Sequence, residues 1–272
     1  MKTDMIPRGV LRLTPCSYGL SKLQFRGPRR PTDGRYVAFL GGSETFGKYI
    51  PKPFPDHVET AIGEVCVNLG CQSAGPDAFL HDTAIQSLCY DAAATVIQLP
   101  GATGLSNAFY KVHPRRNDRF IALTDELMAL YPEIDFAEIS FTGHLIARLC
   151  AVDNDRFELV RKQLAATWTR RMKSLVGQAN GPVILLWFAS RAPQNASTGI
   201  RSASHPAFVS RKMIEGLRPY VSEIIEVVAE RRTTDGMQFA PLDAVAAEEM
   251  LGIAAHEAAA KALRRPLIRA LG

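Results

Sequence analysis

The residues best suited to chemistry lie in the segment Gly41-Gly-Ser-Glu-Thr45, directly after the apolar run Tyr36–Leu40. Glycine permits the positive φ of a sharp turn, and such a turn after a buried strand lifts the next hydroxyl above the sheet edge. Ser43 is therefore the candidate nucleophile, and the backbone N–H groups around Gly42 are candidate donors to an oxyanion. Glu44 is either a carboxylate in the same crevice or a cap for the following turn.

The same segment satisfies the first seven positions of a phosphate-binding loop, from Gly42 to Lys48. In that motif a Ser or Thr follows the lysine and binds magnesium, but Tyr49 stands there. Prolines then interrupt residues 51–55, where the loop should open a long helix that receives phosphate. No later apolar strand ends in an Asp that would complete the metal site. We therefore do not expect hydrolysis of a nucleoside triphosphate.

Five apolar runs have the length of strands, and segments with helical periodicity separate them. These runs are 36–40, 65–69, 95–99, 183–188 and 223–228. Such alternation predicts an α/β fold, a three-layer α/β/α sandwich with a mainly parallel sheet of the flavodoxin-like kind. Ligands of open sheets bind at the carboxyl ends of the strands. Four of these ends are rich in glycine and small polar residues: Gly41–Gly47, Gly70–Asp77, Gly101–Asn107 and Ala189–Asn195.

Capping residues and apolar periodicity indicate where the connecting helices lie. Asp56 is expected to cap a helix that runs to about Gly63. Pro76 suits the first turn of a helix that runs to about Tyr90. The remaining helical segments are expected at 119–131, at 135–177 and, as one helix or a pair, at 242–263.

The glycine-rich strand ends resemble the sequence blocks of the SGNH, or GDSL-like, hydrolase superfamily. In that family a Gly-Asp-Ser block follows the first strand, and here the block is Gly41-Gly42-Ser43, without the Asp. A second block has a glycine whose N–H serves the oxyanion hole, and Asn68-Leu-Gly70 resembles it. A third supplies an Asn donor, for which Asn107 is the nearest candidate. The resemblance implies an SGNH-like fold and a serine esterase or O-acyltransferase.

The resemblance does not identify a general base. The family places Asp-x-x-His before the last helix, but here Asp235-Gly-Met-Gln238 has Gln in place of His. His256, further along, is one candidate base, with Asp235 or Asp243 orienting it, and it is equally a candidate structural residue. His113 is an alternative base because it follows the loop after the third strand.

The densest polar run of the chain after residue 35 is His113-Pro-Arg-Arg-Asn-Asp-Arg119. Arg115 and Arg116 could clamp a carboxylate, sulfate or phosphate through paired N–H groups. With Lys48, they also fit a site for sulfuryl or phosphoryl transfer. The alternative is a solvated loop in which Asp118 pairs with an arginine.

The positive charge of the chain is concentrated at its start. The 272 residues carry a net charge of +5, yet residues 1–35 hold eight Lys and Arg against two Asp. That segment is therefore +6 and the remainder −1, which does not favour a nucleic-acid partner. We expect a basic, irregular segment at 1–35, either solvated or in contact with an anionic partner, followed by one α/β domain at 36–272.

The composition excludes several classes of protein. A hydrophobic fraction of 47% excludes a disordered chain. No apolar run is long enough to span a membrane, and no signal peptide is recognised, so we expect a cytoplasmic protein. The five cysteines are an odd number without a usual zinc spacing, and no histidine pair has the spacing of a zinc site, so we expect free thiols, no metal and no cofactor.

The chain is also similar to an uncharacterised bacterial family, over most of residues 26–263. The similarity lies in the segments 39–45, 68–75 and 112–120. It implies no activity. We therefore expect an esterase or O-acyltransferase that acts on a small-molecule or glycan ester. The alternatives are a catalytically degenerate protein that binds an anion or a sugar, and the group transferase described above.

Overall fold

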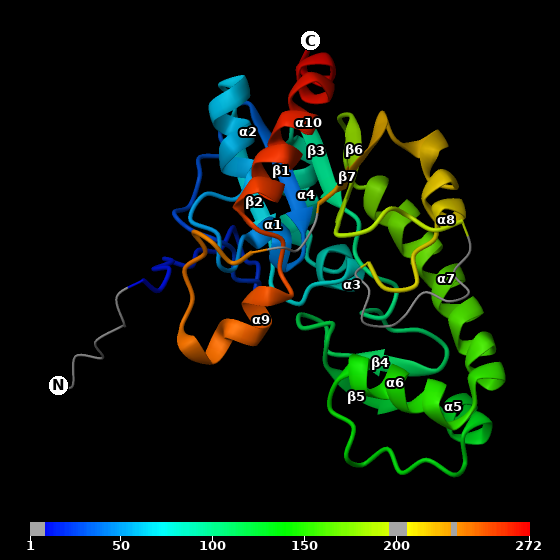
Figure 1. Ribbon diagram of the computed structural model, residues 1–272. Coiled ribbons are helices and arrows are strands. Elements are labelled where there is room, and N and C mark those ends of the chain that lie inside the picture. The colour runs from blue at the N-terminus through cyan, green and yellow to red at the C-terminus, as the bar shows by residue number, and fades with distance from the viewer. Residues whose placement is uncertain (1–8, 196–205, 230–232) are drawn as a thin grey trace.

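Five parallel strands form the centre of the molecule in a computed structural model, which describes residues 9–195, 206–229 and 233–272. The strands lie in the order β2-β1-β3-β6-β7, and every neighbouring pair is parallel (Figure 1). Their bounds are β1 Tyr36–Gly41, β2 Val65–Gly70, β3 Ala94–Gln98, β6 Val183–Ala189 and β7 Glu223–Val228. The predicted α/β class and all five predicted strands are confirmed.

Strands β1, β3 and β6 are buried on both sides because helices cover both faces of the sheet. In β1, Val37 and Phe39 belong to one buried cluster, whereas Ala38 and Leu40 belong to the other. The first cluster is covered by α2 (Phe54–Ile62) and α10 (Ile253–Leu271), which pack against each other in front of the sheet in Figure 1. The second cluster is covered by α3 (Pro76–Leu80), α4 (Thr83–Asp91) and α7 (Asn154–Val176).

Residues 110–152 form an extension below the carboxyl ends of the strands in Figure 1. It contains the antiparallel pair β4 (Tyr110–Val112) and β5 (Phe120–Leu123), then α5 (Asp125–Leu130) and α6 (Thr142–Val152). The prediction of a helix over 119–131 was therefore wrong for its first half. The reason is local: the Thr124 hydroxyl accepts from the Leu127 N–H, so the helix begins only after Thr124.

Three other predicted helices differ at their boundaries. The segment 135–177 forms two helices, α6 and α7, and residues 135–141 lie outside both. Residues 76–90 form two helices, because the Asp82 carboxylate accepts from the N–H groups of Ala84 and Ile85 and starts α4. Helix α2 begins at Phe54, before Asp56, with Pro55 in its first turn. The alanine-rich region is a pair, α9 (Ala244–Glu248) and α10, and α8 is Arg211–Glu215.

The described part of the basic segment, residues 9–35, is irregular and packs on the sheet domain. Tyr18, Leu23 and Phe25 are buried in the core. Arg26 is also buried, and its guanidinium donates to the carbonyls of Phe46 at 3.3 Å, Gly47 at 2.7 Å and Pro51 at 2.7 Å. This segment therefore supports the turn that follows the short helix α1 (Ser43–Phe46).

No helix in the described residues is long and apolar enough to cross a membrane. The five cysteines are free, as the sequence predicted. Burial raises the pKa of the Cys71 thiol to about 11 and that of Cys89 to about 12. These two thiols are therefore protonated and unreactive at neutral pH.

Helix α1 rests directly on the end of the sheet, and two glycines make this approach possible. A Cβ at Gly70 would lie 2.3 Å from the backbone nitrogen of Phe46. A Cβ at Gly41 would lie 2.1 Å from the Thr45 hydroxyl. The second and third positions of the Gly41-Gly-Ser segment are thereby held against the carboxyl edge of the sheet.

We expect Gly70→Ala to destabilise the protein by roughly 1–3 kcal/mol, because α1 must move away from β2 to admit the methyl group. Urea unfolding measures the change. Gly143→Ala in α6 is the matched control, since a Cβ there meets nothing within 4 Å and alanine favours a helix. Equal free energies of unfolding for the two variants would contradict this account of α1.

Candidate functional site

A cavity of about 190 Å³ lies at the carboxyl ends of β1, β3 and β6, where the sequence predicted the ligand crevice. The ends of these strands and the segment before α10 enclose it. Its polar lining includes the side chains of Ser43, Glu44, Ser73 and Gln98. Apolar walls come from Leu99, Phe188, Met250 and Leu251. A half-closed apolar cavity with a few converging polar groups has the character of a small-molecule site.

Ser43 is the first residue of α1 and follows Gly42 directly, so the predicted position of the nucleophile in the crevice agrees with the geometry. The predicted turn with a positive φ is not found. Gly42 has φ −86°, which any residue can adopt, so the turn does not use the left-handed region. Of the two glycines before Ser43, Gly41 is required for space, because a Cβ there would collide with Thr45 and Gln98.

Gln98 is the polar residue that the sequence analysis missed. Its side-chain Oε1 accepts from the Thr45 N–H at 3.1 Å and from the Thr45 hydroxyl at 2.5 Å. Because Oε1 is occupied in this way, the amide nitrogen is the group left to serve the cavity that Gln98 lines. The available signal was the single polar residue at the end of the apolar strand Ala94–Gln98.

Glu44 lines the cavity and also anchors the segment before α10. Its Oε1 accepts from the Leu251 N–H at 3.1 Å, and its Oε2 lies 3.8 Å from Nε2 of His256. Of the two alternatives that the sequence left open, the structure shows the first: the carboxylate lies in the crevice, and it binds a backbone N–H outside its own helix. The N–H belongs to a distant segment and not to the following turn.

His256 lies behind Glu44, fully buried between aromatic rings. Its ring stacks on Phe54 and meets Phe188 edge-on. Nδ1 accepts from the Phe54 N–H at 3.1 Å, so the proton of the neutral ring is on Nε2, toward Glu44. Burial, together with the charges of His57 and Arg26, lowers the pKa of His256 to about 3. The imidazole is therefore neutral, and its Nε2 faces Oε2 of Glu44 at 3.8 Å, beyond hydrogen-bond distance.

This arrangement differs from the predicted base. Among the described residues, no histidine hydrogen-bonds to the Ser43 hydroxyl, and both nitrogens of His256 face other groups. The predicted orienting residues also lie elsewhere. Asp235 is exposed in a turn, and Asp243 lies 3.9 Å from Lys48. The carboxylate beside His256 is Glu44, which the family pattern does not place there.

Two predicted oxyanion donors are used for other contacts. The Gly70 N–H donates to Oδ1 of Asn68 at 2.9 Å, so it does not point into the cavity. Asn107 is buried and folds its own loop: its Nδ2 donates to the Leu105 carbonyl, and its Oδ1 accepts from the N–H groups of Phe109 and Tyr110. Gly70 and Asn107 are thus engaged elsewhere, and Gln98 is the carboxamide that lines the cavity.

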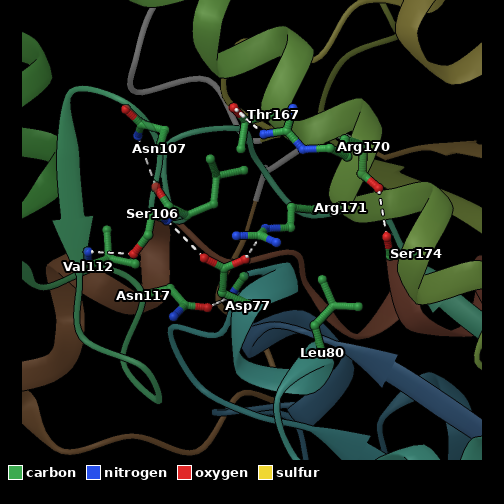
Figure 2. Close-up of polar contacts among 12 residues, drawn as sticks. Asp77, Leu80, Ser106, Asn107, Val112, Asn117, Thr167, Arg170, Arg171 and Ser174 are labelled. Carbon is green, nitrogen blue, oxygen red and sulfur yellow. Dashed lines mark hydrogen bonds and ion pairs between the residues drawn. The ribbon is translucent and has the colours of Figure 1, made fainter.

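The loop after the third strand is fixed by buried polar contacts (Figure 2). Asp77 accepts from the Ser106 N–H at 2.9 Å, and Nε of Arg171 lies 3.0 Å from its other oxygen. In the same region, the Asn117 carboxamide accepts from the Gly75 N–H at 2.7 Å and donates to the His113 carbonyl at 2.9 Å. These contacts tie three loops at the sheet edge into one unit.

His113 does not fit the predicted role of alternative base. Its Nδ1 accepts from the N–H groups of Arg115 and Arg116, each at 3.2 Å. The imidazole therefore shapes the arginine-containing turn. Arg116 lies 3.5 Å from Asp118, as the solvated-loop alternative predicted, while the Arg115 guanidinium donates at 3.5 Å to the Lys22 carbonyl.

The described residues contain no group of three His, Cys, Asp or Glu side chains that could hold a metal ion. The cavity does not resemble a metal centre either, since Glu44 is its one carboxylate among the lining residues. The chemistry that the residues themselves offer is that of a hydroxyl, a carboxylate and a carboxamide.

Comparison with known proteins identifies a family. Residues 1–271 match a family described as "Domain of unknown function (DUF6473)". The chain belongs to this family. The match agrees with the sequence similarity carried by residues 39–45, 68–75 and 112–120. No curated protein is significantly similar to the chain.

One solved structure that matches is "BT4096 a gut microbial diltiazem-metabolizing enzyme", with 14% sequence identity and a TM-score of 0.24. The alignment covers 71% of this chain and 34% of that protein, so the chain spans about a third of its length. The likeness is distant, and at this TM-score it carries no argument about the site of this DUF6473 chain.

The buried His256 makes the free energy of unfolding depend on pH. Its pKa is about 3 when folded and near 6.5 when unfolded, so between these values the unfolded chain binds more protons. The stabilisation is full above pH 6.5 and is lost as the pH falls toward 3. Between pH 7 and 4.5, it accounts for roughly 2–3 kcal/mol.

Urea unfolding of His256→Asn should therefore show a smaller loss between these two pH values than the wild type shows. Asparagine keeps an acceptor for the Phe54 N–H but does not take up a proton. The exposed His81→Asn is the control and should keep the wild-type difference. An unchanged pH difference in His256→Asn would show that the imidazole is not buried neutral.

Proposed function

We propose that the chain is a serine-dependent esterase or O-acyltransferase, with Ser43 as nucleophile. The observation that carries the proposal is the composition of one cavity of about 190 Å³. Ser43, Glu44 and Gln98 all line it, and they offer a hydroxyl, a carboxylate and a carboxamide. Acyl transfer needs a nucleophile, a base and a donor to the oxyanion, and these three groups supply them. The SGNH-like block Gly41-Gly42-Ser43 supports the choice of Ser43.

Glu44 takes the place of the absent histidine as the base. As neighbours on one helix, Ser43 and Glu44 do not face each other, so the proton passes between them through one water molecule in the cavity that both line. His256 is a positioning residue, because its buried ring packs behind Glu44 with Nε2 facing Oε2 of the carboxylate at 3.8 Å. The Leu251 N–H fixes the other oxygen.

The proposed reaction has two steps, acylation of Ser43 and deacylation. The Ser43 oxygen forms a bond to the ester carbonyl carbon, its proton moves to Glu44, and the carbonyl oxygen becomes an oxyanion that accepts from the Gln98 amide. The bond to the leaving oxygen breaks, and that oxygen takes the proton from Glu44. Water or an acceptor hydroxyl next attacks the acyl-serine, and the Ser43 oxygen recovers a proton by the same route. Water gives hydrolysis, and an acceptor gives acyl transfer.

A second candidate function is binding without turnover. It is favoured by the position of His256, which is buried behind Glu44 and does not contact the Ser43 hydroxyl. Group transfer with Lys48, Arg115 and Arg116 is a separate alternative, since these residues line a neighbouring groove and not the Ser43 cavity. Absence of any serine labelling would favour either alternative over the esterase.

A fluorophosphonate probe tests the nucleophile. We expect the wild type to be labelled and to hydrolyse p-nitrophenyl acetate, and Ser43→Ala to lose both, because the attacking oxygen is removed. Ser87→Ala, which removes an exposed hydroxyl on α4, is the matched control and should behave as the wild type. Labelling that persists in Ser43→Ala would exclude Ser43 as the nucleophile.

The pH profile of kcat/KM tests the base. We expect a rise with pH through one carboxylate ionisation, and a loss of roughly a hundredfold to ten-thousandfold in Glu44→Gln. His256→Asn should lower kcat and keep the shape of the profile, because the imidazole only positions Glu44. A profile that follows a histidine and disappears in His256→Asn would restore the histidine as the base.

A further inference from the structure

A second, larger groove of about 630 Å³ opens beside the Ser43 cavity. Its lining carries four cationic side chains and no carboxylate. The charged and polar groups that the argument uses are Lys22, Lys48, Ser73, His113, Arg115 and Arg116. Two carboxylates lie at its margin and partly offset the charge: Asp118, 3.5 Å from Arg116, and Asp243, 3.9 Å from Lys48.

Hydrogen bonds fix the loop that carries Arg115 and Arg116. His113, which lines the groove, accepts from the backbone N–H groups of both arginines through Nδ1, so in the neutral ring the proton is on Nε2. The fully buried Asn117 holds the same loop, with its side chain on the Gly75 N–H and the His113 carbonyl. Because the backbone is fixed, binding an anion orders only the ends of the Arg115 and Arg116 side chains.

Ser73 joins the groove to the Ser43 cavity, since it lines both. It has φ +59°, a conformation that costs a residue with a side chain about 1 kcal/mol or more and persists only where its surroundings hold it. The Asn117 N–H donates to the Ser73 carbonyl at 3.0 Å and so ties the strained residue to the arginine loop. The two hollows therefore share a wall that is fixed to both.

We propose that this groove is an anion subsite of the Ser43 site, and that the substrate is an ester whose non-reacting part carries a carboxylate, sulfate or phosphate group. The ester part of this inference rests on the proposed function, whereas the anion part rests on the groove alone. Guanidinium groups bind such oxyanions through paired N–H groups, and the two lysines add charge without fixing its direction. The ester group reaches Ser43 past Ser73 while its anionic end stays in the groove.

A binding experiment tests the groove without any need for catalysis. Sodium sulfate, phosphate and acetate are titrated into the wild type, Arg115→Gln/Arg116→Gln and Arg264→Gln/Arg265→Gln at constant ionic strength, with calorimetry as the readout. The third protein is the matched control, because it loses the same charge from adjacent exposed positions of α10. We expect the wild type and the control to bind at least one anion, and the groove variant to bind it roughly tenfold or more weakly.

A kinetic experiment tests the link to Ser43. Phenyl acetate, 4-acetoxybenzoate and 4-sulfophenyl acetate present one acetyl ester with a neutral, carboxylate or sulfonate end. The ratio of kcat/KM for each charged ester to that for phenyl acetate should be roughly tenfold or more in the wild type and in Arg264→Gln/Arg265→Gln. In Arg115→Gln/Arg116→Gln the ratio should fall toward one.

The outcomes separate this inference from the proposed function. Hydrolysis with no preference for charged esters, and equal anion affinity in all three proteins, would overturn the anion subsite and leave the esterase intact. Anion binding that depends on Arg115 and Arg116, in a protein that hydrolyses none of the esters, would support the subsite and overturn the ester substrate. If the preference for charged esters and the binding of anions both disappear in Arg115→Gln/Arg116→Gln alone, the whole proposal is supported.

Discussion

One carboxylate holds together the parts of the molecule that enclose the cavity. Glu44 belongs to the short helix after β1, its Oε1 binds the Leu251 N–H, and its Oε2 faces His256 on α10. The first and last parts of the described domain are thus joined at the carboxyl edge of the sheet. Charged groups are costly to bury unless they are hydrogen-bonded, and the Leu251 N–H provides such a bond to Oε1 of this carboxylate.

His256 is buried behind this carboxylate by contacts of its own. The ring fills an aromatic site between Phe54 and Phe188, and Nδ1 satisfies the first-turn N–H of α2, which has no partner within its own helix. A histidine so placed stabilises the fold at neutral pH and directs its remaining proton at Glu44. Of the two roles that the sequence left open for His256, general base or structural residue, these contacts are those of a structural residue.

Helix α1 illustrates how far the site depends on tertiary contacts. Four residues are too few to form a stable helix in isolation. Its position comes from the sheet below, through Gly70, from the Thr45 contacts to Gln98, and from the guanidinium of Arg26 under its last turn. Ser43 is held in the cavity by these neighbours, and the sequence of α1 itself contributes little to that placement.

The strands of the central sheet could be predicted because burial on both faces produces continuous apolar runs, as in Val183–Ala189. The segment 119–131 could not, since Phe120-Ile-Ala-Leu123 is too short to distinguish a strand from a helix by period, and its partner β4 has three residues.

The candidate site was predictable only in part. Ser43 follows a strand directly, so local sequence places it at the sheet edge. The pairing of Glu44 with His256, and of Gln98 with Thr45, joins residues distant in the chain, and no local pattern specifies such contacts. The contacts that occupy the predicted donors Gly70 and Asn107 are local instead, since the Asn68 side chain and the Leu105 carbonyl each lie two residues away in the chain.

The most direct test of the account is a crystal structure of the protein after reaction with a small alkyl fluorophosphonate, whose tetrahedral adduct has the geometry of the acyl-transfer intermediate. We expect phosphorus bonded to the Ser43 oxygen, and the phosphoryl oxygen about 3 Å from the Gln98 side-chain nitrogen, with Glu44 on the opposite side of the adduct. An adduct on another residue, or a phosphoryl oxygen that points away from Gln98 into solvent, would contradict the assignment of this cavity as an acyl-transfer site.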